Sequence, residues 1–141
     1  MKPITKILHY TLIALNGFLA LTAFAGGIGL LANLNAPPVE LLQGSPFRNY
    51  TVPGLALFVV VGGGGLLSAI LLARRNKFAL VFSIAAGIVI MFFEFVEMLV
   101  IGSPAGVART LQIFYFGLGT LIVAVALLKM FLDLLDHPIN G

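Results

Sequence analysis

The chain has 141 residues, of which 60% are hydrophobic and 9% are charged, and its mean hydropathy is +1.13. Soluble domains carry about 25% charged residues, so this composition excludes a soluble globular protein and predicts a protein of the lipid bilayer. The net charge of +3 comes from a few basic residues, mostly near the ends of apolar segments, which indicates membrane topology and excludes a nucleic-acid-binding patch.

The apolar segments predict, in chain order, four membrane-spanning helices separated by polar connections. We expect them at residues 7–31, 53–73, 78–101 and 107–130, each of about 20 to 25 residues, the length that crosses a bilayer. Residues 32–52 form the long outer loop. Because these elements nearly exhaust the chain, the sequence predicts an all-α fold, a four-helix integral membrane bundle in which residues 1–141 form a single membrane domain.

The first span admits two interpretations. Lys2 and Lys6, an apolar stretch and then Ala23-Phe24-Ala25 have the form of a cleavable signal peptide, whose removal would leave three spans. Apolar sequence continues as far as Leu31, which is longer than a signal-peptide core, so we expect an uncleaved helix. Asn16, inside this helix, is expected to hydrogen-bond to another span.

Lysine and arginine are divided unevenly between the two ends of the predicted helices. Arg48 and Arg109 lie on the side of the long loop, and the others lie on the opposite side: Lys2, Lys6, Arg74, Arg75, Lys77 and Lys129. Because basic residues are retained on the cytoplasmic side, we expect both termini to be cytoplasmic, in a multi-pass protein of the inner membrane.

Four consecutive glycines, Gly62, Gly63, Gly64 and Gly65, occur near the middle of the second span. Glycine allows membrane helices to approach closely, so one interpretation is a packing groove for another helix. The other interpretation is a kinked or broken helix that lines a ligand cavity. We favour packing.

Ionisable residues occur inside the third and fourth spans, where charge is costly unless it is paired or faces a cavity. The short turn at residues 102–106 makes these two helices antiparallel, so residues at equal depth face each other in a regular series. The expected opposite pairs are Glu97 with Arg109, Glu94 with Gln112, and Gly87 with Gly119.

This series also has two interpretations. In the structural one, Glu97 and Arg109 form a buried ion pair that locks the hairpin, and Glu94 is satisfied by Gln112 or Tyr115. In the functional one, these side chains form a polar binding cluster in which Glu94 takes up a proton, a cation or a polar ligand. We favour the structural interpretation.

The outer loop carries Arg48, which would add a second cation to this cluster if the loop packed over it as a lid. The alternative, which we slightly prefer, is a rigid connector on the lipid headgroups. No catalytic residue, metal or cofactor is predicted, because the chain has no cysteine, and His9 and His137 lie at the opposite end of the bundle from the glutamates.

In residues 45–119 the chain resembles small four-span bacterial membrane proteins. The resemblance lies in the loop string 45–54, the glycine-rich second span, the Glu94-x-x-Glu97 step and the string Leu111-Gln112-x-x-Tyr115-Phe116-x-x-Gly119. It implies a four-span architecture and an inner-membrane location, and it implies no catalytic residue.

Three classes of function remain, in order of preference. The first is a non-catalytic accessory or scaffold subunit that packs through Gly-rich helix faces, in a homo-oligomer or a larger membrane complex. The second is an oligomeric transporter or channel that uses the polar cluster of Glu94, Glu97 and Arg109 near the outer surface. The third is a membrane enzyme on a lipid-soluble substrate, with a glutamate as general acid or base.

Overall fold

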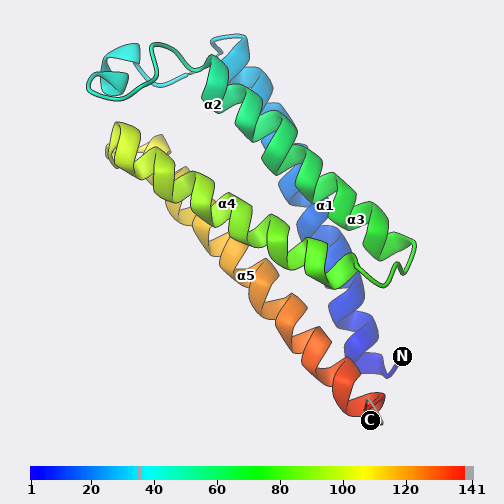
Figure 1. Ribbon diagram of the computed structural model, residues 1–141. Helices are drawn as coiled ribbons and strands as arrows, with labels where there is room; N and C mark the ends of the chain where they lie inside the picture. Colours follow the sequence, from blue (N-terminus) through cyan, green and yellow to red (C-terminus); the bar gives the residue numbers. More distant parts are fainter. Residues whose placement is uncertain (35, 139–141) are drawn as a thin grey trace.

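The computed structural model describes residues 1–34 and 36–138, most of which belong to four long helices (Figure 1). These are α1 (Pro3–Leu31), a second span composed of α2 (Thr51–Leu55), a π-helical segment (Ala56–Gly62) and α3 (Gly63–Ala73), then α4 (Ala79–Ile101) and α5 (Val107–Asp136). Each span is long and apolar enough to cross a membrane. The prediction of an all-α protein with four apolar helices packed together is confirmed.

Two helices extend beyond their predicted bounds at the end of the molecule where both termini lie (Figure 1). α1 begins already at Pro3, because the missing N–H of proline costs nothing in the first turn. α5 continues to Asp136, and its last turns contain an ion pair of Lys129 Nζ with Asp133 Oδ2 at 2.7 Å. A second ion pair, at 2.6 Å, joins Lys2 Nζ at the start of α1 to Asp136 Oδ1 at the end of α5.

The helices form two antiparallel pairs that lie against each other. α1 packs along the second span, from α2 to α3, and α4 packs along α5. Figure 1 shows that the two pairs separate toward the end of the molecule that carries the long loop. We refer to that end as the loop end and to the opposite one as the terminal end.

Glycine contacts hold α1 against the second span. A Cβ atom built on Gly62 would lie 2.7 Å from the ring of Phe24, and one built on Gly65 would lie 3.0 Å from the carbonyl oxygen of Asn16. For Gly63 and Gly64, no atom of the described residues lies within 4 Å of such a Cβ. Two of the four consecutive glycines therefore pack inside the chain and two do not.

A second glycine contact holds α4 against α5. A Cβ on Gly87 would lie 2.8 Å from the carbonyl oxygen of Gly119, and a Cβ on Gly119 would lie 2.6 Å from the carbonyl oxygen of Gly87. The two backbones can approach this closely only because neither residue has a side chain. The sequence places these two residues opposite each other, and in the structure they are in contact.

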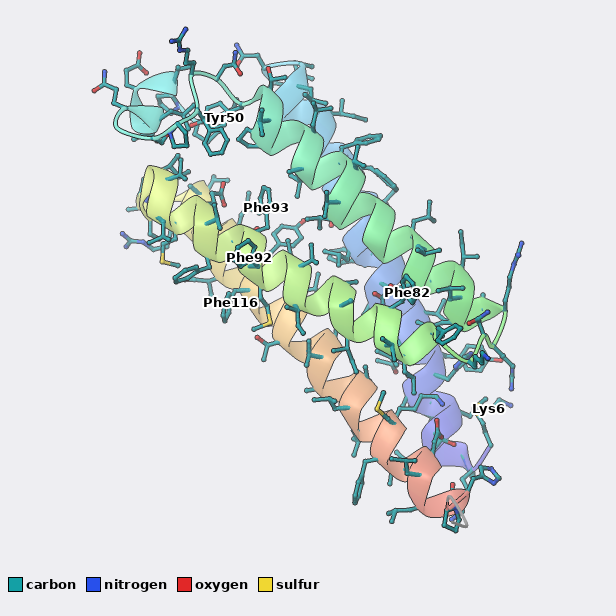
Figure 2. All side chains as sticks on the ribbon, viewed as in Figure 1. Lys6, Tyr50, Phe82, Phe92, Phe93 and Phe116 are labelled. Carbon is teal, nitrogen blue, oxygen red and sulfur yellow. The ribbon has the colours of Figure 1, made fainter. Side chains whose placement is uncertain are left out.

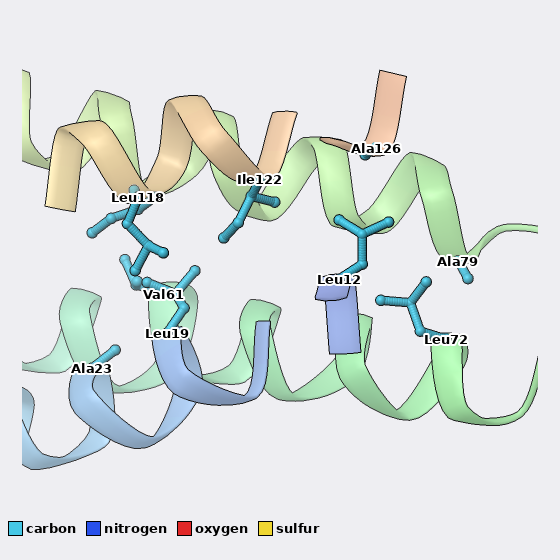
Figure 3. Close-up of a cluster of buried hydrophobic side chains, with 10 residues drawn as sticks. Leu12, Leu19, Ala23, Val61, Leu72, Ala79, Leu118, Ile122 and Ala126 are labelled. Atoms are coloured by element: carbon cyan, nitrogen blue, oxygen red, sulfur yellow. The ribbon is translucent and has the colours of Figure 1, made fainter. Parts of the chain in front are cut away.

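Buried apolar side chains fill the space between the two pairs (Figure 3). They include Leu12, Leu19, Val61, Leu72, Ile90 and Ile122. Among them, Asn16 Nδ2 donates a hydrogen bond to Ser83 Oγ at 2.8 Å, which links α1 to α4. The prediction that Asn16 hydrogen-bonds to another span is confirmed.

Candidate functional site

A cavity of about 290 Å³ lies between the two helix pairs at the loop end. The π-helical segment and the start of α2 form one wall, α4 forms the opposite wall, and the loop forms the roof. The lining residues are Leu30, Leu42, Phe47, Tyr50, Val52, Pro53, Ala56, Val60, Val61, Val89, Phe92, Phe93, Val96, Glu97, Val100 and Ile101. Figure 2 shows Phe93 extending from α4 toward the second span, and Tyr50 beneath the loop.

Several residues that line the cavity are also exposed on the outer surface of the bundle. Val52 and Val60 on the second span and Phe92 on α4 are each more than half exposed, and Phe92 is 66% exposed. These residues belong to helices that are long and apolar enough to span a membrane, so their exposed faces contact lipid. Part of the cavity wall is therefore made by residues of the second span and α4 that also contact lipid.

The π-helical segment contributes Ala56, Val60 and Val61 to the wall. π-Helical turns are rare and often occur at functional sites, because they shift the side chains that follow by about one position relative to an α-helix. Gly62 closes the segment and packs on Phe24 of α1. The glycine-rich span thus has features of both interpretations: Gly62 and Gly65 pack against α1, and an irregular helical segment lines a cavity.

The roof is a small apolar cluster of Leu42, Tyr50 and Ile101, supported by neighbouring loop residues. The Tyr50 hydroxyl donates to the carbonyl oxygen of Pro38 at 3.2 Å. Burial raises the pKa of Tyr50 above its ordinary value, and the carboxylates of Glu97 and Glu40 raise it further. Tyr50 therefore lies in the field of Glu97, across the cavity.

Of the described residues that line the cavity, Glu97 alone carries a carboxyl group. Glu94 lies one helical turn deeper on α4 and is only 4% exposed, and its carboxyl group neighbours that of Glu97. Gln112, on α5, is 2% exposed and lies near these carboxyl groups. These three side chains form a polar group on the α4 side of the cavity, which we call the acceptor cluster.

The acceptor cluster contains oxygen atoms without a donor. Gln112 Nε2 donates to the carbonyl oxygen of Gly102 at 3.0 Å. Glu94 Oε2 and Gln112 Oε1 are both buried, and neither has a hydrogen-bond partner among the residues that the structure describes. Buried acceptors of this kind are uncommon, because an unmade hydrogen bond in an apolar interior is costly.

The expected ion pair of Glu97 and Arg109 is not formed. Arg109 is exposed, and its Nε and Nη2 atoms donate to the carbonyl oxygen of Ser103 at 3.1 and 2.6 Å. Within the described part of the chain, the ion pairs are the two at the terminal end. The physical reason is local: the turn between α4 and α5 presents an unpaired carbonyl group within reach of the guanidinium in the first helical turn.

The two remaining predicted residues, Arg48 and Tyr115, do not hydrogen-bond to the acceptor cluster in the described structure. Arg48 is exposed and lines a separate hollow within the loop. Tyr115 is half-buried and packs against the main core, with its ring 5.2 Å from that of Phe114. The loop does cover the cavity, but it does so with apolar side chains and without Arg48.

Most of the residues that line the cavity could not be identified from the sequence. Phe93, Val96 and Val61 are apolar residues in apolar helices, and nothing in their spacing separates a cavity wall from a lipid-facing surface. The burial of Lys129 was not predicted either: its side chain is only 8% exposed and pairs with Asp133. The spacing of four residues between these two opposite charges was a usable signal.

Comparisons of the chain with protein-family models, with curated proteins and with solved structures found no match. The resemblance to small four-span bacterial membrane proteins therefore has support only at the level of architecture, in four long apolar helices.

Proposed function

We propose that this protein is a non-catalytic membrane protein that binds one lipid-soluble molecule in the cavity at its loop end. The observation that carries the proposal is the cavity itself: it has a volume of about 290 Å³ and an almost wholly apolar wall, and some of its lining residues on the second span and α4 are exposed where the helices meet lipid. Ligand pockets in proteins begin at roughly this size and are mostly apolar, with a few placed polar groups. A molecule dissolved in the bilayer would reach this cavity without crossing water.

The loop end is taken as the outer side of the inner membrane. Basic residues support this orientation, because the terminal end carries Lys2, Lys6 and the turn Arg74-Arg75-Asn76-Lys77, whereas the loop end carries Arg48 and Arg109. Under this orientation both termini are cytoplasmic, and the ligand comes from the outer leaflet.

Packing below the cavity argues for binding rather than for conduction through a single chain. Leu19, Ile90 and Ile122 are almost completely buried between the two helix pairs, and Asn16 hydrogen-bonds to Ser83 in the same interface. A channel or a transporter pathway would need this layer to part. A binding site that ends above it needs no such change.

A second candidate is the accessory subunit that packs through glycine, and it rests on Gly63 and Gly64 alone. Both leave open space where a Cβ would be, and Leu66 and Leu67 beside them are exposed. The other packing glycines that the sequence singles out, Gly62, Gly65, Gly87 and Gly119, are occupied by contacts within the chain. A homo-oligomer or a larger complex would therefore use a smaller glycine face than the sequence suggests.

Native mass spectrometry of the protein, extracted gently from its own membrane, tests the proposal. We expect wild-type protein to retain a small-molecule adduct. Ala56→Phe places a ring inside the cavity and is expected to reduce the adduct-bearing fraction at least about tenfold. Ala25→Phe is the matched control, because Ala25 is an exposed residue of α1 that does not line the cavity.

Two results would count against the proposal. One is wild-type protein that carries no small molecule under conditions that preserve bound lipid. The other is an adduct that Ala56→Phe and Ala25→Phe retain equally. Departure from the membrane together with a partner protein, with the cavity empty, would favour the accessory subunit.

A further inference from the structure

We propose that the ligand carries a primary ammonium group, which binds at the acceptor cluster where Glu97 meets the cavity and Glu94 and Gln112 stand behind it. This inference rests on the proposed function and names the chemistry of its ligand: an amphipathic amine with an apolar body. The body lies along the apolar wall, and the ammonium group contacts the Glu97 carboxyl.

Donors and acceptors are unbalanced in the acceptor cluster. Glu94, Glu97 and Gln112 have five side-chain oxygen atoms, and the N–H donors among these three side chains are those of the Gln112 amide. That amide donates to the carbonyl oxygen of Gly102. Glu94 Oε2 and Gln112 Oε1, on side chains that are 4% and 2% exposed, are left without a donor in the described structure. The site calls for a group that donates several hydrogen bonds and accepts none.

The basic side chains Arg109, Arg48 and Lys129 of the described chain have other partners or positions and do not pair with the acceptor cluster. Arg109 is turned to the carbonyl oxygen of Ser103, and Arg48 lies in a separate hollow of the loop. Lys129 is paired with Asp133 at the terminal end. Two carboxyl groups inside a membrane protein normally face a partner or a pathway, so the partner here is supplied from outside the chain.

Among the polar groups that a lipid-soluble ligand can carry, a primary ammonium group fits the acceptor cluster best. An ammonium group has three N–H donors, no acceptor and a positive charge, which fits the cluster on each count. A hydroxyl group has one donor and no charge. A quaternary ammonium could stack on Phe93 or Tyr50, but it has no N–H for the orphaned oxygens. Within the described residues there is no group of three or more His, Cys, Asp or Glu side chains that could hold a metal ion. The apolar wall of the cavity also offers almost no ligands to a hydrated metal ion.

The experiment is a competition in lipid nanodiscs that compares four probes with the same alkyl chain: dodecylamine, dodecanol, dodecyltrimethylammonium and dodecanoate. The protein is incubated with an equimolar mixture, and bound probes are counted by native mass spectrometry against protein-free nanodiscs. We expect dodecylamine to be bound about tenfold or more in excess of dodecanol, with the quaternary ammonium and the carboxylate lower still.

Variants assign the preference to the cluster. Glu97→Gln is expected to reduce the amine-to-alcohol ratio about tenfold while dodecanol still binds, because the cavity is unchanged. Glu97→Asp is expected to retain part of the preference. Ala25→Phe keeps the wild-type ratio. Helix content and monodispersity are checked for each variant, and the four-probe ranking on wild-type protein tests the proposal even if Glu97→Gln does not fold.

The outcomes separate this inference from the proposed function. If none of the probes binds, or Ala56→Phe binds all of them as wild type does, the cavity proposal itself fails. If the probes bind in the cavity but amine and alcohol bind equally, or the preference survives Glu97→Gln, the cavity stands and the ammonium proposal is overturned. Equal binding of the primary and the quaternary ammonium also overturns it, since the orphaned oxygens would then play no part.

Discussion

The contact between Gly87 and Gly119 makes a sharp prediction about stability. We consider Gly119→Ala on α5, which adds one methyl group facing α4. That methyl would lie 2.6 Å from the carbonyl oxygen of Gly87 and 2.7 Å from side-chain carbons of Ile90 and Met91. Gly117→Ala, two residues earlier on the same helix, is the matched control, because outside its own stretch of helix a Cβ there meets no atom of the described residues within 4 Å.

The size of the effect follows from these distances. Ordinary van der Waals contact starts at 3.4 Å, so the two backbones must separate by up to about 0.8 Å at Gly119. The atom in the way is a backbone carbonyl of a helix, which cannot rotate aside. Overpacking of this kind costs about 1–3 kcal/mol. Alanine in place of glycine recovers about 0.5–1 kcal/mol through helix propensity, and Gly117→Ala has this gain without the clash.

The assay is reversible unfolding in mixed micelles, with helicity followed by circular dichroism as the denaturing detergent increases. We expect Gly119→Ala to unfold about 1–2 kcal/mol more easily than wild type, and Gly117→Ala to be neutral or slightly more stable. Equal midpoints for the two variants would show that the helices do not approach closely at this point. The register of α4 against α5 would then be wrong.

Three further predictions concern polar contacts. Asn16→Leu removes the bond to Ser83 and should cost about 0.5–1.5 kcal/mol in the same assay, with most of the effect lost in a Ser83→Ala background. Asp133→Asn weakens the partner of the buried Lys129 and should cost about 1–3 kcal/mol, whereas replacing both residues by leucine or methionine should restore most of it. The fold raises the pKa of Tyr50 above its ordinary value of 10.0, so the folded protein favours the neutral phenol. The stability that Tyr50 contributes is therefore complete below pH 10.0 and is lost as the pH rises through the raised pKa. Melting temperatures measured across this range should fall less for Tyr50→Phe than for wild type.

The helices and their pairing could be predicted from the sequence because they follow from length, hydropathy and spacing. The apolar runs are long enough to span a bilayer, and they fold as four long helices. The antiparallel register that places Gly87 opposite Gly119 follows from the shortness of the turn between α4 and α5. These properties depend on residues close in the sequence or on one simple symmetry.

The partner of Arg109 and the position of the cavity depend on three-dimensional geometry, which length, hydropathy and residue spacing do not determine. The sequence offers Arg109 the Glu97 carboxylate as a partner, whereas in the structure Arg109 donates to the carbonyl oxygen of Ser103 in the turn. Gly102 and Gly106, which flank this part of the turn, have positive φ angles of 73° and 105°, a conformation that glycine adopts without strain. The cavity depends on how two helix pairs diverge, which no periodicity within a single helix encodes.

The distribution of close glycine contacts explains why the cavity lies where it does. Gly27, Gly54, Gly62 and Gly65 bring α1 and the second span together, and Gly87 and Gly119 bring α4 and α5 together. All of these contacts lie within a pair. Between the pairs, the described contacts are mainly those of larger apolar side chains, together with the hydrogen bond from Asn16 to Ser83 and, at the terminal end, the ion pair of Lys2 and Asp136.

Two tightly joined pairs with a looser interface between them can separate at one end without loss of contact inside either pair. The acceptor cluster lies at that interface, with Glu94 and Glu97 on α4 and Gln112 on α5, both elements of the same pair. A ligand that enters from the membrane would therefore meet a preformed polar group on one rigid wall, while the other wall and the loop adjust to its apolar body. Gly119→Ala should accordingly weaken the fold and disturb the acceptor cluster, whereas Asn16→Leu should loosen the interface between the pairs and leave the cluster intact.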